Sequence, residues 1–191
     1  NRYIAYLREH GIRPAVTAST GIAATHIGGS TIHSWSGIGA RTELTDRELD
    51  DLTQKEATVK RVNGTDVLII EEVSMLDARL LDTLDALLRA LRQKERPFGG
   101  MQVVFVGDFF QLPPVAKLDA GRFAFNAGAW RELNPVVCYL TDQYRQEDAS
   151  FCELLSAIRH QAVGEPERAL LEARLVSRED EVGNLPIVYC M

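Results

Sequence analysis

The sequence contains little cysteine, no long apolar run and no excess of positive charge. Its three cysteines, Cys138, Cys152 and Cys190, are odd in number and share no spacing typical of metal ligands, which argues against a disulfide framework and favours a reducing compartment. No apolar run approaches the roughly 18 residues that span a bilayer. The first residues, NRYIAYLREHG, lack the apolar core of a signal peptide and have the pattern of an amphipathic helix.

The charge balance limits the kinds of partner. The 191 residues include 27 acidic and 21 basic side chains, for a net charge of −6. A protein that binds duplex DNA through a broad basic patch has the opposite balance, so any nucleic-acid contact must be local. The chain is long enough for one large core, or for one core and part of a second.

Short apolar runs alternate with helical stretches, which indicates a parallel α/β sheet flanked by helices. We predict strands in the segments PAVTAS, DVLII, MQVVFVGD and VVCYL. We predict helices over about Arg2–Glu9 and in TGIAATHIGG, DARLLDTLDALLRALRQ and SFCELLSAIRH, and either a helix or an excursion in TDRELDDLTQKEATVKR. Three of the strands end in polar residues, and the ligands of an open parallel sheet bind beyond the carboxyl ends of its strands. We therefore expect these three ends to face one crevice.

The first polar strand end is the adjacent pair Glu71 and Glu72, which follows the buried run DVLII. Two neighbouring carboxylates repel each other and resist burial. Mg²⁺ prefers oxygen ligands, and a second carboxylate can orient or deprotonate an attacking water. The pattern is therefore typical of a Walker B motif, although two solvated glutamates at the end of a strand are a common alternative.

The second polar end lies in GDFFQLPPV and the third in LTDQYRQ. Gly107 permits a sharp turn and two prolines restrict the following loop, which would hold Gln111 near a phosphate or a water. We assign Asp108 and Gln111 to nucleotide binding. Arg145 could stabilise charge on a γ-phosphate. The alternatives are a plain Gly-Asp turn with a Pro-Pro stop, and a surface ion pair.

A fourth segment, TASTGIAATHIGGSTIHSW, combines hydroxyl groups, glycines and the start of a helix. Several backbone N–H groups can point outward there, which suits the phosphates of a nucleic acid. His33 and Trp35 could stack on bases. A single histidine or tryptophan is, however, more often a core residue.

In this order, the segments TASTGIAA, GGSTIHSWSGIG, VLIIEEVSML, PFGGMQVVFVGDFFQLPPV and LTDQYRQED resemble the Pif-one family of superfamily-one B DNA helicases. The resemblance covers nearly the whole chain, is weakest over residues 41–62 and after residue 164, and is most specific in GDFFQLPP. It implies a RecA-like P-loop NTPase fold. It also implies an ATP-dependent DNA helicase that couples Mg-ATP hydrolysis to 5′-to-3′ translocation on single-stranded DNA.

The resemblance also implies roles for individual residues. It assigns the tracking of single-stranded DNA to the motif formed by Thr17, Ser19, Thr20 and Gly21, and the next DNA contact to His33. It assigns roles in ATP hydrolysis to Glu71 (metal anchor), Glu72 (activation of water), Gln111 (γ-phosphate sensor) and Arg145 (arginine at the domain interface).

The chain departs from the family pattern in two ways. Glu71-Glu72 stands where the family usually has Asp-Glu, and no G-x-x-x-x-G-K-[ST] P-loop occurs. We therefore expect an incomplete domain in which the Arg2–Glu9 helix is the tail of the P-loop helix. Residues 1–145 would form most of the first RecA-like domain, and residues 146–191 the connecting helices and the start of a second.

The expected cofactors are ATP and Mg²⁺, and the expected partners are single-stranded DNA and DNA junctions, without a membrane. Such a helicase would serve DNA repair, recombination or telomere maintenance, in the cytoplasm of a bacterium or in the nucleus or mitochondrion of a eukaryote. Two other functions stay open. One is a RecD-like DNA-dependent NTPase, and the other is a degenerate DNA-binding module without enzymatic activity.

Overall fold

A computed structural model of the chain describes residues 2–114, 123–140 and 148–175. The chain forms two compact units, residues 1–137 and residues 138–191. The first unit contains the sheet and all of the candidate site residues that the structure describes. The second contains helices α8 (Ala149–Arg159) and α9 (Glu165–Glu172), which confirms the helix predicted in SFCELLSAIRH.

The first unit is built on a parallel sheet of four strands in the order β2-β1-β3-β4. The strands are β1 (Pro14–Ala18), β2 (Ser30–Thr31), β3 (Val67–Glu71) and β4 (Gln102–Phe105). The register places Ala18 beside Glu71 and Ile70 beside Phe105. The carboxyl ends of the strands therefore lie at one edge of the sheet, because all strands are parallel. The predicted α/β fold class is confirmed.

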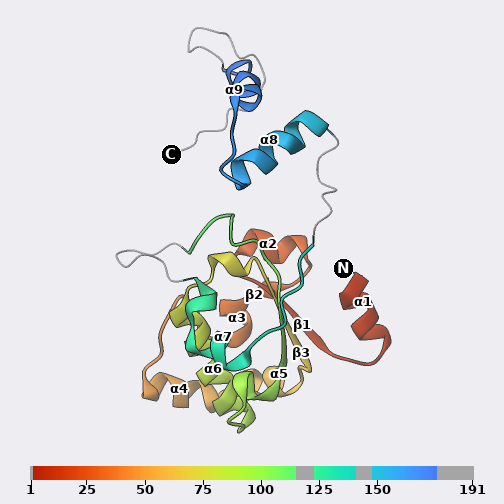
Figure 1. Cartoon of the computed structure of the whole chain (residues 1–191). Coiled ribbons are helices and arrows are strands. Elements are labelled where there is room, and N and C mark those ends of the chain that lie inside the picture. Colours follow the sequence, from red (N-terminus) through yellow and green to blue (C-terminus); the bar gives the residue numbers. More distant parts are fainter. Residues whose placement is uncertain (1, 115–122, 141–147, 176–191) are drawn as a thin grey trace, which may run out of the picture. The chain divides into compact units, whose positions relative to one another are not determined.

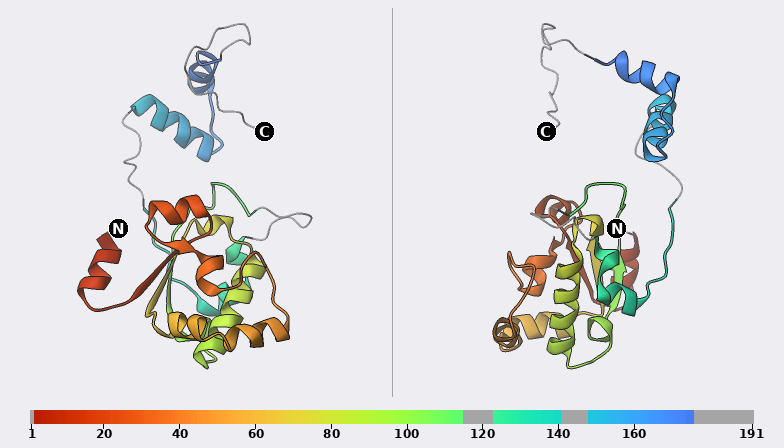
Figure 2. Two further views of the ribbon diagram at one scale, coloured as in Figure 1. Left: turned by 180° about the vertical axis from the view of Figure 1, so that it is seen from behind. Right: turned by 60° about the vertical axis from the view of Figure 1, so that its left-hand side comes forward.

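Helices cover both faces of this sheet (Figures 1 and 2). One face packs against α3 (Ile32–Ser36), α4 (Asp46–Thr53), α5 (Glu56–Asn63), α6 (Ala78–Arg92) and α7 (Gly128–Leu133). The other face packs against α1 (Arg2–Glu9), and α2 (Gly21–His26) follows β1. Leu68 and Ile70 of β3 belong to the first core, whereas Val67 and Ile69 belong to the second. This alternation explains why the strand is apolar at every position.

Helix α6 is the longest element that the structure describes, at 15 residues. It begins after Asp77, whose carboxylate accepts a hydrogen bond from the Leu80 N–H at 2.7 Å, and it ends at Gln93 in a left-handed conformation. Its leucines recur at helical spacing and are buried, which confirms the prediction from DARLLDTLDALLRALRQ. The cap at Asp77 is relevant to the site because it fixes the start of α6 shortly after β3 and η1.

The strand predicted in VVCYL is wrong. Residues 134–140 have no strand structure, and the side chains of Val136 and Val137 are 90% and 61% exposed. The reason is that the segment pairs with no strand: among the described residues β4 pairs only with β3, and residues 134–140 do not join the sheet. Strand propensity is expressed only where a neighbouring strand supplies hydrogen bonds.

Three short 3₁₀ helices complete the described structure: η1 (Val73–Met75), η2 (Pro97–Gly100) and η3 (Ala124–Asn126). None of the described helices is both long and apolar enough to cross a membrane.

Candidate functional site

The loops that follow β1, β3 and β4 are joined by main-chain hydrogen bonds at one edge of the sheet. The N–H of Ser19, just after β1, donates to the carbonyl oxygen of Glu71 at 3.1 Å. The N–H of Val73, just after β3, donates to the carbonyl oxygen of Val106 at 3.0 Å. The structure therefore brings two of the three predicted polar ends together, and places the predicted DNA-tracking loop beside them.

Glu72 has a left-handed backbone conformation, with φ 55° and ψ 45°. A residue other than glycine pays roughly 1–2 kcal/mol for this conformation. Strain of this kind persists only where the surrounding structure imposes it, and it is concentrated at functional sites. The conformation turns the chain sharply out of β3 and into η1, so it sets where the Glu72 side chain leaves the strand end.

The two carboxylates lack a positive partner within the described part of the chain. Burial, and after it the negative charge of Glu72, raises the pKa of the Glu71 carboxyl. Neither carboxylate makes a hydrogen bond or an ion pair with a described residue. A divalent cation with oxygen ligands would offset both the repulsion and the desolvation, so the pair fits Mg²⁺.

No group of three or more metal-ligating side chains occurs among the described residues.

The loop after β4 begins against the end of β3. A Cβ atom on Gly107 would lie 2.9 Å from the backbone nitrogen of Val73, so the close approach of the two loops requires glycine here. Asp108 then closes a turn: its carboxylate accepts from the Phe110 N–H at 3.1 Å and from the Gln111 side-chain amide at 3.3 Å. Its carbonyl accepts from the Gln111 N–H at 3.0 Å. The exposed amide of Gln111 is thus oriented by Asp108.

Aromatic packing holds this loop on the first unit. The ring of Phe109 makes edge contacts with three aromatic rings, at centroid distances of 4.9–6.1 Å, those of Phe123, Phe125 and Trp130. Pro114, at the far end of the loop, is buried. The loop is therefore anchored at both ends, as the prolines predict, and Gln111 lies between the anchors.

Two predicted DNA-contacting residues are buried, and one predicted catalytic residue lies outside the described residues. Thr17 is 0% exposed, and its hydroxyl donates to the Ile69 carbonyl oxygen at 2.7 Å, so it ties β1 to β3. Trp35 is 6% exposed and belongs to the core, so its ring is not available to a base. Arg145 lies outside the described residues, and its role stays a prediction.

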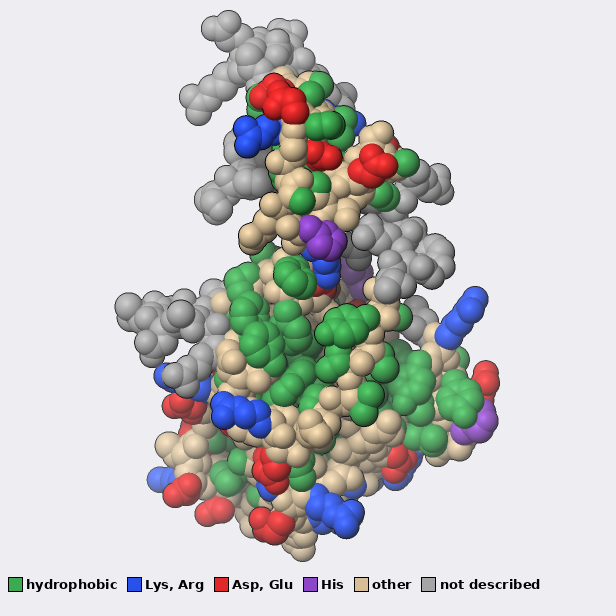
Figure 3. Space-filling model, viewed as in Figure 1, with side chains coloured by type: hydrophobic (Ala, Val, Ile, Leu, Met, Phe, Trp, Pro, Cys, Tyr) green, Lys and Arg blue, Asp and Glu red, His purple; other side chains and the backbone are tan. Residues whose placement is uncertain are grey.

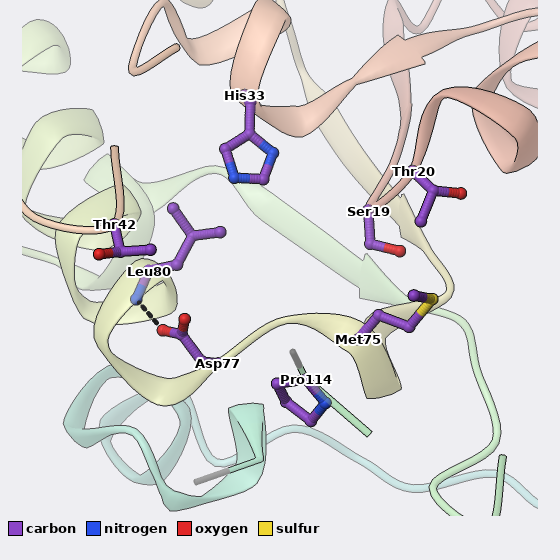
Figure 4. Close-up of a pocket in the computed structure, with 8 residues that line it drawn as sticks. All are labelled: Ser19, Thr20, His33, Thr42, Met75, Asp77, Leu80 and Pro114. Carbon is purple, nitrogen blue, oxygen red and sulfur yellow. Dashed lines mark hydrogen bonds between the residues drawn. The ribbon is translucent and has the colours of Figure 1, made fainter. Parts of the chain in front are cut away.

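A hollow of about 250 Å³ opens beside the loop that follows β1 (Figure 4). It is lined by Ser19, Thr20, His33, Thr42, Met75, Asp77, Leu80 and Pro114. These residues come from segments far apart in the sequence, including α3 and the turn between β3 and α6. Three of them were predicted as DNA contacts. The sequence signal for the others is weak, because a methionine, a helix cap and a leucine are ordinary core or capping residues.

The polar groups of this hollow are set up for hydrogen bonding rather than for charge neutralisation. Burial lowers the pKa of His33, while the charge of Asp77 acts in the opposite direction. The imidazole is therefore neutral at pH 7, with one donor and one acceptor nitrogen. The Ser19 hydroxyl oxygen is buried without a hydrogen-bond partner among the described residues. Thr20 caps α2 by accepting from the Ala23 N–H at 3.2 Å, and Gly21 is exposed at the start of that helix.

Comparison with known sequences gives a consistent result. The family profile described as PIF1-like helicase matches residues 1–165. The ATP-dependent DNA helicase Pif1 of Psychrobacter sp. (strain PRwf-1) is 51% identical over 150 residues, which cover 77% of this chain and 23% of that protein. The ATP-dependent DNA helicase PIF1 of Homo sapiens is 43% identical over 144 residues, which cover 75% of this chain and 22% of that protein. The chain thus spans about a fifth of the length of these relatives.

Solved structures agree with this result. The Pif1 helicase from Bacteroides in complex with ADP-AlF3 and ssDNA matches 90% of this chain with a TM-score of 0.78 and 35% identity, and the match covers 42% of that chain. The Pif1 helicase from Candida albicans matches 94% of this chain with a TM-score of 0.77 and 35% identity, over 41% of that chain.

Proposed function

The chain belongs to the PIF1-like helicase family, and we propose that it is part of an ATP-dependent DNA helicase that couples Mg-ATP hydrolysis to translocation on single-stranded DNA. The observation that carries this proposal is the hydrogen-bonded junction of the three loops at one edge of the sheet, which places the acidic pair, the Gln111 loop and the DNA-tracking loop together. The family resemblance implies 5′-to-3′ polarity and roles at DNA junctions in repair, recombination or telomere maintenance. The site of action would be the cytoplasm of a bacterium, or the nucleus or mitochondrion of a eukaryote.

A strand-displacement assay on the full-length protein, run beside an ATPase assay, tests the proposal. ATP-dependent unwinding would support it. Hydrolysis without unwinding would favour a RecD-like DNA-dependent NTPase. Loss of both activities in a correctly folded protein would indicate a non-enzymatic DNA-binding module.

In the proposed ATPase reaction each polar group of the strand ends has a separate task. Glu71 holds Mg²⁺, which when bound neutralises phosphate charge. Glu72 orients or deprotonates the attacking water from its left-handed position. Gln111, oriented by Asp108, hydrogen-bonds the γ-phosphate or positions the water. Arg145 is proposed to contact the same phosphate on the strength of the resemblance.

We propose a position in the sheet for the P-loop strand that the family resemblance implies. Helices α5 and α6 lie on one face of the sheet and the chain moves from β1 through β3 to β4, whereas α1 lies on the opposite face. Connections between parallel strands are right-handed, so a parallel strand that leads into α1 must lie on the β3 and β4 side of β1. On that side of β1, strands β3 and β4 already occupy the first two positions of the sheet. The P-loop strand would therefore pair with β4 on the side that faces away from β3.

The first unit has exposed apolar side chains, and we propose that a further strand would cover part of this surface. Figure 3 shows apolar side chains gathered on the face of the first unit that is turned to the viewer. Val106, Phe125, Val136 and Val137 of this unit are exposed apolar side chains. We propose that the P-loop strand binds there, and that residues 136–140 then form the next strand.

This proposal predicts that residues 1–191 alone bind Mg-ATP negligibly, while the full-length protein has an ATPase activity that single-stranded DNA stimulates. The P-loop supplies the backbone cradle and the lysine that hold the β- and γ-phosphates, and neither occurs in this sequence. Isothermal titration calorimetry of the 191-residue chain measures the first part. Micromolar affinity for ATP in that experiment would contradict the prediction.

We propose that single-stranded DNA passes over the loop after β1 and enters the hollow of Figure 4. Ser19 and Thr20 offer hydroxyl groups and Gly21 offers its backbone N–H group to the phosphates, and neutral His33 offers hydrogen bonds or a stacking surface. A short contact of this kind requires no broad basic patch, which reconciles DNA binding with the net charge of −6.

Because Trp35 is buried and His33 is only partly buried, we expect substitutions of the two residues to have opposite effects on stability and on DNA affinity. In the full-length protein, Trp35→Phe should lower the free energy of unfolding by about 1–3 kcal/mol and leave the affinity for single-stranded DNA unchanged. His33→Ala should lower that affinity and leave stability nearly unchanged, because the imidazole is only partly buried. Denaturant titration and fluorescence anisotropy with oligo(dT) measure the two quantities. A selective loss of DNA affinity in Trp35→Phe would instead indicate that the Trp35 ring contacts DNA.

A further inference from the structure

We propose that Met75 is a positioning residue through which single-stranded DNA in the hollow of Figure 4 stabilises the working conformation of Glu72. This inference rests on the proposed function and adds a means of regulating it. Met75 lines the hollow together with Ser19 and Thr20. It also lies only three residues after the proposed catalytic carboxylate, in the same turn.

Two residues of the hollow hold the Glu72 backbone from both sides. The Ser19 N–H donates to the carbonyl oxygen of Glu71, and the Met75 N–H donates to the carbonyl oxygen of Glu72, each at 3.1 Å. The peptide groups on both sides of the Glu72 Cα atom are therefore hydrogen-bonded to two residues that line the hollow. These two hydrogen bonds link the hollow directly to the backbone of Glu72.

The conformation held in this way is the left-handed one, which costs free energy. Because Glu72 has φ 55°, the turn is stable only while its surroundings impose it. Val73 and Leu76 are buried and fix the inner side of the turn, with the Leu76 N–H donating to the Val73 carbonyl oxygen at 3.1 Å. The outer side depends on Met75 and Ser19. Contacts there by DNA would favour the conformation that aims Glu72 at the nucleotide, which is a shift of a pre-existing equilibrium.

The surroundings of Met75 are those of a contact residue and not those of a core residue. Its side chain is partly exposed and belongs to neither of the two apolar cores. Figure 4 shows it reaching from the turn toward Ser19 and Thr20. The Ser19 hydroxyl oxygen is buried and lacks a hydrogen-bond partner among the described residues, so it can bond to a ligand. A flexible thioether beside it can pack on a sugar or a base.

Kinetics of the full-length protein test this inference through the ratio of kcat at saturating oligo(dT) to kcat without DNA. We expect Met75→Ala to lower this ratio by about 2- to 30-fold, the range for residues that carry coupling between sites. Met75→Leu should retain it, because leucine keeps the packing volume. The matched control is Met101→Leu, a substitution of a buried core methionine, which should also retain the ratio.

A second measurement detects the coupling without nucleotide. Hydrogen exchange at the Met75 and Ser19 amides of the wild-type protein should slow when oligo(dT) is added, and the change at Ser19 should be smaller in Met75→Ala. A ratio in Met75→Ala equal to that of the wild type would overturn the inference. So would an equal loss in Met75→Leu, or a loss that disappears at higher DNA concentration, which would leave Met75 as a DNA contact alone. If the wild-type ATPase is absent or is not stimulated by DNA, it is the proposed function that fails.

Discussion

Replacing Glu72 with glutamine in the full-length protein should lower kcat by about 100-fold or more while ATP still binds. Glutamine keeps the shape of the side chain and removes the base that the left-handed turn places at the end of β3. By contrast, Glu71→Asp should keep kcat within about tenfold, a barrier change of about 1.4 kcal/mol or less. Magnesium retains several waters, and a contact through water tolerates a side chain one methylene shorter.

Steady-state ATPase assays of both variants with saturating single-stranded DNA measure this difference, and nucleotide binding by Glu72→Gln serves as the control for folding. Equal losses in the two variants would show that the two roles are assigned wrongly. An unchanged kcat in Glu72→Gln would favour the alternative that the two glutamates are a solvated strand end, despite the raised pKa of Glu71.

The second large effect is expected at Gln111. Gln111→Ala should lower kcat by about 10- to 1,000-fold, the range that includes loss of one stabilising donor and loss of an arginine finger. KM for ATP should rise far less, because the contact is made mainly in the transition state. The measurement is the full kcat and KM dependence on ATP. A rise in KM at constant kcat would instead assign Gln111 to ground-state binding.

Asp108→Asn provides a matched test of how Gln111 is oriented. Asparagine can still accept from the Phe110 N–H, but it presents an N–H₂ group where Asp108 accepts from the Gln111 amide. Two donors cannot pair, so the Gln111 amide should turn over, and kcat should fall. In the Gln111→Ala background the same substitution has no amide to reorient, and any loss that remains there reports the other contacts of Asp108. Full additivity would contradict the orienting role.

Local patterns in the sequence were sufficient for the elements that depend on their own residues. The repeated leucines of Ala78–Arg92 and the cap at Asp77 specify a helix, because both signals act within a few residues. The run Val67–Glu71 specifies a strand that is buried on both faces. The glycine, prolines and glutamine of GDFFQLPP likewise predict a restricted loop, and the order of these motifs identified the family.

The tertiary structure decided which side chains reach the site. Trp35 and Thr17 lie in motifs that resemble DNA contacts, yet both are buried, because composition does not state which face of an element is turned inward. The segment VVCYL has strand propensity but no strand structure, since a strand exists only beside another strand. Met75 and Asp77 join Ser19 and His33 in one hollow only because β1 and β3 are neighbours in the sheet. The motifs therefore indicated the chemistry of the site, and the packing determined which residues lie in it.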